Sequence, residues 1–211
     1  MRRSAMIRGS FYNRRMPAAF SETAMHWKTA MRSIPLWAAL MPLSCLGQKP
    51  PPQVMINAPY VTTPAAVIMK MLKLANVTRT DVLYDLGSGD GRIVIAAARS
   101  FGARGVGIEL NRERIQHAQE NARRAGVLPL VTFRRENFFE SDLREATVVT
   151  LYLLPEVNLA LRPKLLRELR PGARIVSNCF DMGDWKPSKQ IDVNGCKIYF
   201  WSVPAGGTLG N

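Results

Sequence analysis

Apolar and polar residues divide the 211-residue chain into segments whose length and period separate strands from helices. Short apolar runs predict strands at 82–85, 105–110, 130–135, 146–152 and 173–179. Between these runs apolar residues recur at helical spacing, which predicts helices over 64–74, 91–101, 111–126 and 157–169. The run 146–152 is rich in β-branched residues, as expected of a strand buried on both faces. Strands that alternate with helices predict a doubly wound α/β sheet.

The C-terminal part of the chain breaks this alternation. Two apolar runs, 191–193 and 197–203, flank Asn194-Gly195, a dipeptide typical of two-residue hairpin turns. The sheet is therefore expected to end in an antiparallel edge. Local signals also mark two helix starts: Thr63 before Pro64 predicts an N-cap, and Asn111 predicts another.

The segment Asp85-Leu86-Gly87-Ser88-Gly89-Asp90-Gly91-Arg92 follows the first predicted strand, and Glu109 ends the second. Glycines allow the backbone to approach a ligand closely, and a carboxylate can accept both hydroxyls of a ribose. The spacing is G-x-G-x-G rather than the dinucleotide fingerprint G-x-G-x-x-G. An acid at position 85 would repel a pyrophosphate but suits an ammonium group. We therefore expect S-adenosylmethionine as cofactor; a purely structural turn and a nicotinamide site are the alternatives.

The first fifty residues differ in composition from the rest. They carry eight Lys/Arg and the single acid Glu22, whereas residues 51–211 carry 21 basic and 15 acidic residues. Segment 1–47 resembles a signal or transit segment. Its apolar part is too short to span a bilayer. A stiff Pro-rich linker follows it. The alternative is that this segment is a disordered basic tail, which results from a wrongly assigned start codon. We expect a leader and linker over 1–53 and one domain over 54–211.

Charge and metal-ligating residues narrow the function further. More than half of the net charge of +13 lies in the leader, so the charge of the whole chain overstates the case for nucleic-acid binding. Cys45, Cys179 and Cys196 lack C-x-x-C spacing, so we expect no disulfide, and buried strand thiols at 179 and 196. His26 and His117 form no familiar metal spacing with them, so we expect no metal.

The motifs resemble those of class I S-adenosylmethionine-dependent methyltransferases. More narrowly, 59–64, 85–92, 150–155 and 180–185 resemble the family of mitochondrial lysine methyltransferases that act on the ATP synthase c subunit and the adenine nucleotide translocase, with bacterial relatives. The resemblance covers about 57–203. It implies a Rossmann-like sheet of seven strands with an antiparallel C-terminal strand.

The expected cofactor-binding residues follow from the motif and the resemblance; they are Tyr60, Thr62, Asp85, Gly87, Gly89, Glu109, Leu110, Asn137 and Phe138. Asn137 stands where the class usually has an acid for the adenine amino group, and its amide oxygen can still accept that bond. Asn178 stands where family members often have histidine. Both departures bear on how active the chain is.

The turn Tyr152-Leu153-Leu154-Pro155 is the expected acceptor site, with Tyr152 as catalytic residue beside the carbonyls of Leu153 and Leu154. An equally open alternative is that Tyr152 only packs beside the adenosine. The turn lacks the N-P-P-Y or D-P-P-Y residues that hold a nucleobase, which disfavours nucleic acid. The resemblance implies a protein lysine as acceptor, including one in a membrane protein. A small molecule, RNA, or cofactor binding without catalysis remain alternatives, and the oligomeric state is open. An exported protein would lack S-adenosylmethionine, so activity requires the cytoplasm or an organelle matrix.

Overall fold

The computed structural model describes residues 61–193 and 195–206. The expected leader and linker over 1–53, and Tyr60, lie outside the described residues. The boundary between 53 and 54 therefore stays a prediction.

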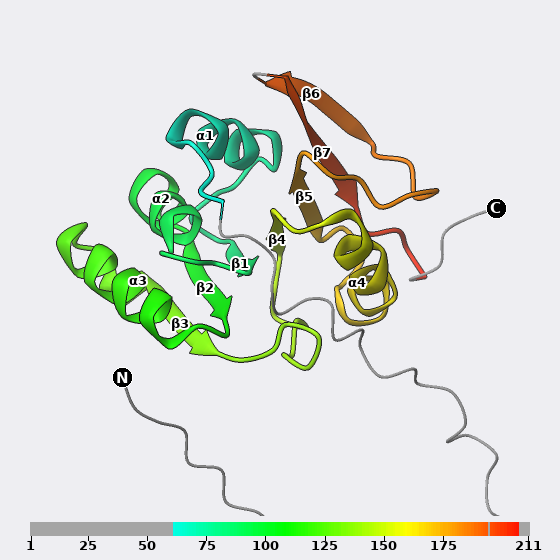
Figure 1. The fold of residues 1–211 in the computed structure, drawn as a ribbon. Coiled ribbons are helices and arrows are strands. Elements are labelled where there is room, and N and C mark those ends of the chain that lie inside the picture. Colours follow the sequence, from blue (N-terminus) through cyan, green and yellow to red (C-terminus); the bar gives the residue numbers. More distant parts are fainter. Residues whose placement is uncertain (1–60, 194, 207–211) are drawn as a thin grey trace, which may run out of the picture. The chain divides into compact units, whose positions relative to one another are not determined.

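The described residues alternate strands and helices as the sequence predicts (Figure 1). The elements are α1 (Ala65–Leu74), β1 (Val82–Leu86), α2 (Arg92–Phe101), β2 (Arg104–Glu109), α3 (Arg112–Arg124), the short 3-10 helix η4 (Leu128–Leu130), β3 (Val131–Arg135), β4 (Val148–Leu151), α4 (Pro155–Glu168), β5 (Arg174–Asn178), β6 (Lys189–Val193) and β7 (Cys196–Ser202). Within 61–193 and 195–206, no helix combines the length and apolar character needed to cross a bilayer.

One seven-stranded sheet runs in the order β3-β2-β1-β4-β5-β7-β6. The first five strands in this order are parallel, whereas β7 is antiparallel to both of its neighbours. Gly195 has φ 82, the left-handed conformation that a two-residue hairpin turn requires. The predicted seven-stranded sheet with an antiparallel C-terminal strand is confirmed.

Strand alternation sorts the buried side chains into two cores, one on each face of the sheet. Leu83 in β1 packs with the apolar sides of α1, α2 and α3. Its neighbour Tyr84 packs on the other face, with α4 and the chain around Trp185 and Trp201. Figure 1 shows α4 set apart from the group formed by α1, α2 and α3. Every residue of β1 is buried, because helices cover both faces of this central strand.

The two predicted helix caps have different outcomes. Asn111 caps α3, since its side chain accepts a hydrogen bond from the Arg114 amide at 3.1 Å. The N-cap prediction for Thr63 is wrong: Pro64 occupies the N-cap of α1, and no side-chain cap bond forms there. Thr63 is instead buried, and its carbonyl oxygen accepts a hydrogen bond from Arg92 at 3.1 Å.

The prediction that Cys179 and Cys196 are free buried thiols is also wrong. The two residues form a disulfide with their Cα atoms 5.0 Å apart, and both are half-buried. The antiparallel pairing of β5 with β7 brings them together, because the Cys179 amide donates to the carbonyl of Lys197 at 2.8 Å. Spacing along the chain cannot show this, since the contact depends on the register of two strands.

Candidate cofactor and acceptor site

A pocket of about 580 Å³ lies where the parallel strands end. Its walls come from the segments that follow β1, β2, β3, β4 and β5, and from 61–63 before α1. Ligands in open α/β sheets bind at the carboxyl ends of the strands, where the strand order changes direction. Here that change lies between β1 and β4, which are neighbours in the sheet. The topology therefore explains why the conspicuous motifs of the sequence meet in one cavity.

The segment 87–92 after β1, which we call the glycine segment, lines this pocket with every residue except Gly91. Gly87 has φ +81, and a Cβ atom there would lie 3.0 Å from Leu153 Cδ2. Gly91 has φ +78, and a Cβ atom there would lie 2.6 Å from the Phe133 ring. Side chains at these two positions would strain the backbone and force their neighbours apart. Gly87 thus keeps the backbone bare in the pocket, whereas Gly91, which does not line it, lets the Phe133 ring pack closely.

Glu109 ends β2 in the pocket wall and is buried. Its carboxylate accepts hydrogen bonds from the amide of Gly89 at 3.0 Å and from the amide of Asn111 at 2.9 Å. The guanidinium of Arg114 lies 3.8 Å away. A carboxylate has about four acceptor positions, so acceptor capacity remains after these two amide bonds. Glu109 is therefore held ready to receive hydroxyl donors.

Asp85, near the end of β1, is also buried in the pocket wall. Burial raises the pKa of its carboxyl group to about 7, and the negative charges of Glu109 and Asp90 act in the same direction. The hydroxyl of Thr150 donates to the carboxylate at 2.7 Å and opposes the shift. A cationic partner would stabilise the ionised form of Asp85. The pocket thus holds a buried carboxyl group that an ammonium group would stabilise in its ionised form.

Asp90 and Arg92 form an ion pair at 2.7 Å beside the glycine segment. Burial acts to raise the pKa of Asp90, but hydrogen bonds and the charge of Arg92 lower it overall. Arg92 also donates to the carbonyl of Thr63, so it links the segment before α1 to the glycine segment. Thr62 and Thr63 consequently line the pocket, as predicted for Thr62.

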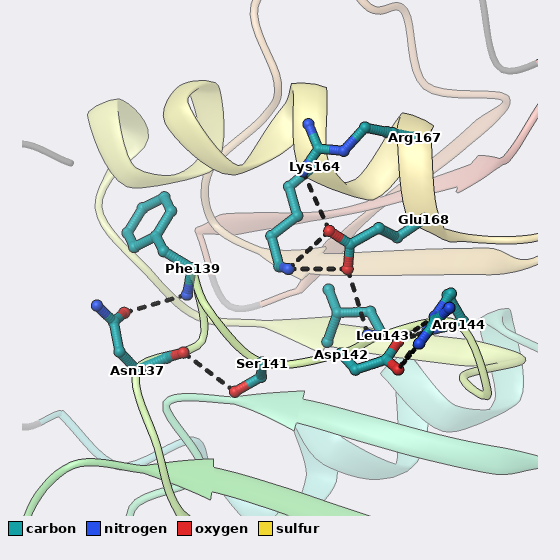
Figure 2. Close-up of polar contacts among 9 residues, drawn as sticks. All are labelled: Asn137, Phe139, Ser141, Asp142, Leu143, Arg144, Lys164, Arg167 and Glu168. Carbon is teal, nitrogen blue, oxygen red and sulfur yellow. Dashed lines mark hydrogen bonds and ion pairs between the residues drawn. The ribbon is translucent and has the colours of Figure 1, made fainter. Parts of the chain in front are cut away.

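Phe138 lies in the pocket wall after β3, as does Leu110 after β2, but Asn137 does not. Figure 2 shows the side chain of Asn137 turned into its own loop. Its amide oxygen accepts from the Phe139 amide at 3.1 Å, and its nitrogen donates to Glu140 at 3.1 Å. The expected adenine acceptor is thus engaged by the backbone, and the side chain borders a second depression instead. Asn137 shapes the loop that presents Phe138.

Helix α4 anchors the far end of the same loop (Figure 2). The amide of Leu143 donates to Glu168 at 3.3 Å, and Lys164 donates to both Glu168 oxygens at 2.8 Å. Hydrogen bonds and the charge of Lys164 lower the pKa of the Glu168 carboxyl against the opposing effect of burial. The loop after β3 is therefore fixed at both ends, with Phe138 between them.

The opposite end of the pocket is aromatic and aliphatic. Tyr152 and Phe180 line it with ring centroids 6.5 Å apart and planes at 22°, and Leu153 and Leu154 complete the wall. The expected role of the Leu154 carbonyl is wrong: it accepts the amides of Val157 and Asn158 at 3.0 and 3.1 Å, closing the first turn of α4. Of the two predicted carbonyls, that of Leu153 stays a candidate for binding an acceptor.

Sequence reasoning missed several residues of this wall, chiefly Phe180 after β5 and Arg114 in α3. Phe180 follows a predicted strand at its carboxyl end, a position that could have suggested it. Arg114 carries no such signal, because its place depends on how α3 packs beside Glu109. In the part of the chain that the structure describes, no group of three or more His, Cys, Asp or Glu residues is placed to bind a metal.

Comparisons with known proteins agree with this geometry. A family model described as the ANTKMT methyltransferase domain matches residues 85–189. A protein-lysine N-methyltransferase of Saccharolobus islandicus is 48% identical over 138 residues, which is 65% of this chain and 86% of that protein. The adenine nucleotide translocase lysine N-methyltransferase of Mus musculus is 34% identical, over 72% of this chain and 66% of that protein. The chain thus spans most of the archaeal relative and just under two thirds of the mouse one.

A solved structure with the same fold is an RNA methyltransferase from Salinibacter ruber in complex with S-adenosyl-L-homocysteine. It is 56% identical, with a TM-score of 0.68, and the match covers 69% of this chain and 95% of that one. The free acceptor positions of Glu109 suit the ribose hydroxyls of such a cofactor, and the buried carboxyl group of Asp85 suits its ammonium group. The chain belongs to the ANTKMT methyltransferase family and is an S-adenosylmethionine-dependent methyltransferase.

Proposed function

We propose that this protein methylates the ε-amine of a lysine side chain in another protein. The observation that carries the proposal is the apolar end of the pocket, where Tyr152, Leu153, Leu154 and Phe180 form the wall. A lysine side chain has a long aliphatic stem that packs well against such surfaces. The names of the archaeal and mouse relatives support a lysine acceptor.

The cofactor-binding residues divide among the parts of the cofactor. Glu109 would hold the ribose hydroxyls, Asp85 the ammonium group, and Leu110 and Phe138 would flank the adenine. Tyr60, outside the described residues, and Thr62 would cover the cofactor from the segment before α1. When bound, S-adenosylmethionine supplies an electrophilic methyl group on a sulfonium. The protein then has to hold a nucleophile in line with that group and exclude water.

A lysine amine must lose its proton before it can attack, because its ordinary pKa is near 10.4. Apolar walls disfavour the charged ammonium form and so lower the pKa of an amine that enters. Tyr152 and the carbonyl of Leu153 would accept hydrogen bonds from the remaining N–H groups and so orient the nitrogen lone pair. This is the catalytic role proposed for Tyr152.

RNA is the second candidate acceptor, because the Salinibacter ruber relative bears the name of an RNA methyltransferase. Two features of the site favour lysine. The turn Tyr152-Leu153-Leu154-Pro155 lacks the amide or acid residue that holds a nucleobase amine. In addition, Arg92 and Arg114 in the pocket wall lie beside the acids Asp90 and Glu109, which reduces their attraction for phosphate.

The test is transfer of a labelled methyl group. The full chain is incubated with methyl-labelled S-adenosylmethionine and with separate membrane, soluble-protein and RNA fractions of a cell extract. We expect label that resists ribonuclease, is removed by protease, and maps to methylated lysine by mass spectrometry. The membrane and soluble fractions show whether the acceptor is a membrane protein. Ribonuclease-sensitive label would establish the RNA activity instead, and label in small metabolites would exclude both.

A further inference from the structure

Asn158, in the first turns of α4, is a polar residue with no exposed surface. Its side-chain nitrogen donates to Ser177 Oγ at 3.1 Å, to the carbonyl of Phe180 at 3.2 Å and to the carbonyl of Asp181 at 3.3 Å. Its side-chain oxygen is buried and has no hydrogen-bond partner among the described residues. An unpaired buried acceptor is unfavourable for stability. Asn158 is therefore not explained as a residue that merely fills the core.

The contacts of Asn158 converge on the segment that leaves β5. One turn later on α4, Arg162 donates to the Met182 carbonyl at 2.9 Å and pairs with Asp184. Gly183 lets Leu159 pack closely, since a Cβ atom there would lie 2.8 Å from Leu159 Cδ2. Helix α4 thus holds the backbone of 180–184 through side chains on successive turns.

This segment carries Phe180, which lines the pocket and faces Tyr152. The chain reverses sharply just before it: Cys179 has φ 67, a left-handed conformation that is uncommon for a residue with a side chain. A loop with such a turn has alternatives of lower strain unless other contacts fix it. The disulfide and the backbone bond to Lys197 hold Cys179 itself, and the carbonyl bonds of Asn158 hold the residues that follow it, Phe180 and Asp181.

We propose that Asn158 is a positioning residue for methyl transfer. By holding the Phe180 and Asp181 carbonyls it sets the Phe180 ring against Tyr152, and so sets the width of the acceptor end of the pocket. It does so without lining the pocket itself. The assignment of this end to the acceptor rests on the proposed function above.

The chain offers a matched comparison on the other side of the site. Asn121 in α3 uses the same group, its side-chain nitrogen, to hold the carbonyl of Asp90 at 3.0 Å in the glycine segment. Asn158→Ala and Asn121→Ala therefore remove the same kind of bond from opposite ends of the pocket. Asn158→Asp keeps the size and shape of the side chain but removes its N–H donors. This variant is used for the test if Asn158→Ala does not fold. Ser177→Ala removes the one Asn158 contact that lies outside the segment.

The experiment compares two quantities in the full chain. Calorimetric titration with S-adenosylhomocysteine measures the affinity for the cofactor. Initial rates of lysine methylation at saturating S-adenosylmethionine measure kcat/KM for the acceptor, when the concentration of the protein fraction that accepts the label is varied. We expect Asn158→Ala and Asn158→Asp to lower the acceptor kcat/KM on the order of 10–100-fold, since small displacements of reacting groups are costly. Their affinity for S-adenosylhomocysteine should stay within about threefold of the wild type, because Asn158 does not line the pocket and separate sites couple weakly. Asn121→Ala should show the reverse pattern, and Ser177→Ala should match the wild type in both.

Hydrogen exchange over 177–184 provides a readout that needs no acceptor. We expect faster exchange there in both Asn158 variants and not in Asn121→Ala. The inference is overturned if exchange or transfer is unchanged, or if cofactor affinity falls as much as transfer does. If the wild type labels something other than lysine, the proposed function fails. The kcat/KM of the Asn158 variants relative to the wild type, measured with whichever fraction accepts the label, then decides the role of Asn158.

Discussion

The carboxylate of Glu109 accepts a hydrogen bond from the backbone amide of Gly89, 3.0 Å away and twenty residues earlier in the chain. This bond joins the two motifs that we expect to bind the cofactor, the glycine segment after β1 and the acid at the end of β2. It means that Glu109 has two tasks, which are to orient the glycine segment and to offer its remaining acceptor positions to a ligand.

Glu109→Ala should weaken S-adenosylmethionine binding on the order of 10–100-fold, because hydrogen bonds to a charged group contribute roughly 1.5–3 kcal/mol. Calorimetric titration measures the change. Glu113→Ala, which removes an exposed acid at the start of α3, is the control and should bind normally. Unchanged affinity in a folded Glu109 variant would remove this residue from the site.

The raised pKa of Asp85 predicts how stability depends on pH. The pKa is about 7 in the folded protein, compared with an ordinary value of 3.8. Between these values the folded protein keeps a proton that the unfolded chain has released, so the free energy of unfolding falls as pH rises to about 7. Asp85→Asn removes this penalty and should stabilise the cofactor-free protein at pH 8 on the order of 2–4 kcal/mol. Urea unfolding at pH 4 and pH 8 tests this, since little gain is expected at pH 4.

The same group predicts a pH dependence of binding. An ammonium partner favours the ionised carboxylate, so S-adenosylmethionine affinity should rise with pH up to about 7 and then level off. Asp85→Asn should bind weakly, with no inflection near pH 7. An inflection that persists in this variant would assign the titration to another group.

Phe138 and Asn137 should differ in their effect on cofactor binding. Phe138→Ala removes a pocket wall and should weaken binding by about tenfold, in line with the roughly 1.5 kcal/mol of an aromatic contact. Asn137→Asp keeps an acceptor for the Phe139 amide but sets a carboxylate against that of Glu140, so its affinity should lie between those of the wild type and Asn137→Leu. Asn137→Leu loses the bond and should bind less well. If Asn137→Leu binds like the wild type while Phe138→Ala does not, the loop holds its shape without this bond.

The sequence predicted those parts of the site that depend on a strand and the residues next to it. Asp85 and Glu109 lie at the carboxyl ends of β1 and β2, and the glycine segment follows β1 directly, so the parallel strands were enough to bring them together. Asn137 also follows a strand, but its side chain bonds to its own loop, which a strand-end argument cannot foresee. Contacts that depend on packing between distant elements, such as Asn158 with the Phe180 carbonyl, left no pattern in the sequence.

The disulfide shows the same limit and leads to a stability prediction. Cys179 and Cys196 are 17 residues apart, and closing a loop of about this size removes roughly 3 kcal/mol of unfolded-state entropy. Reduction should therefore lower the free energy of unfolding by about this amount. Urea unfolding of a Cys45→Ser protein, with and without dithiothreitol, measures the difference. Cys196→Ser in the same background should be as unstable as the reduced protein and should not respond to dithiothreitol. A response to reductant in that variant would contradict the assignment.

Tyr152 should affect methyl transfer more than cofactor binding. Its ring faces Phe180 at the end of the pocket that we assign to the acceptor, whereas Glu109 ends β2, on the other side of β1 in the sheet. Tyr152→Ala should lower kcat on the order of 10–100-fold by loosening the alignment of the amine, while S-adenosylhomocysteine affinity stays within about threefold of the wild type.

Tyr152→Phe keeps the ring and removes the hydroxyl, so it separates packing from hydrogen bonding. If Tyr152→Phe is as slow as the alanine variant, the hydroxyl orients the amine. If it matches the wild type, the ring alone is needed. An equal loss of cofactor affinity and kcat in Tyr152→Ala would instead place this residue beside the adenosine, and the acceptor site would have to be sought elsewhere in the pocket.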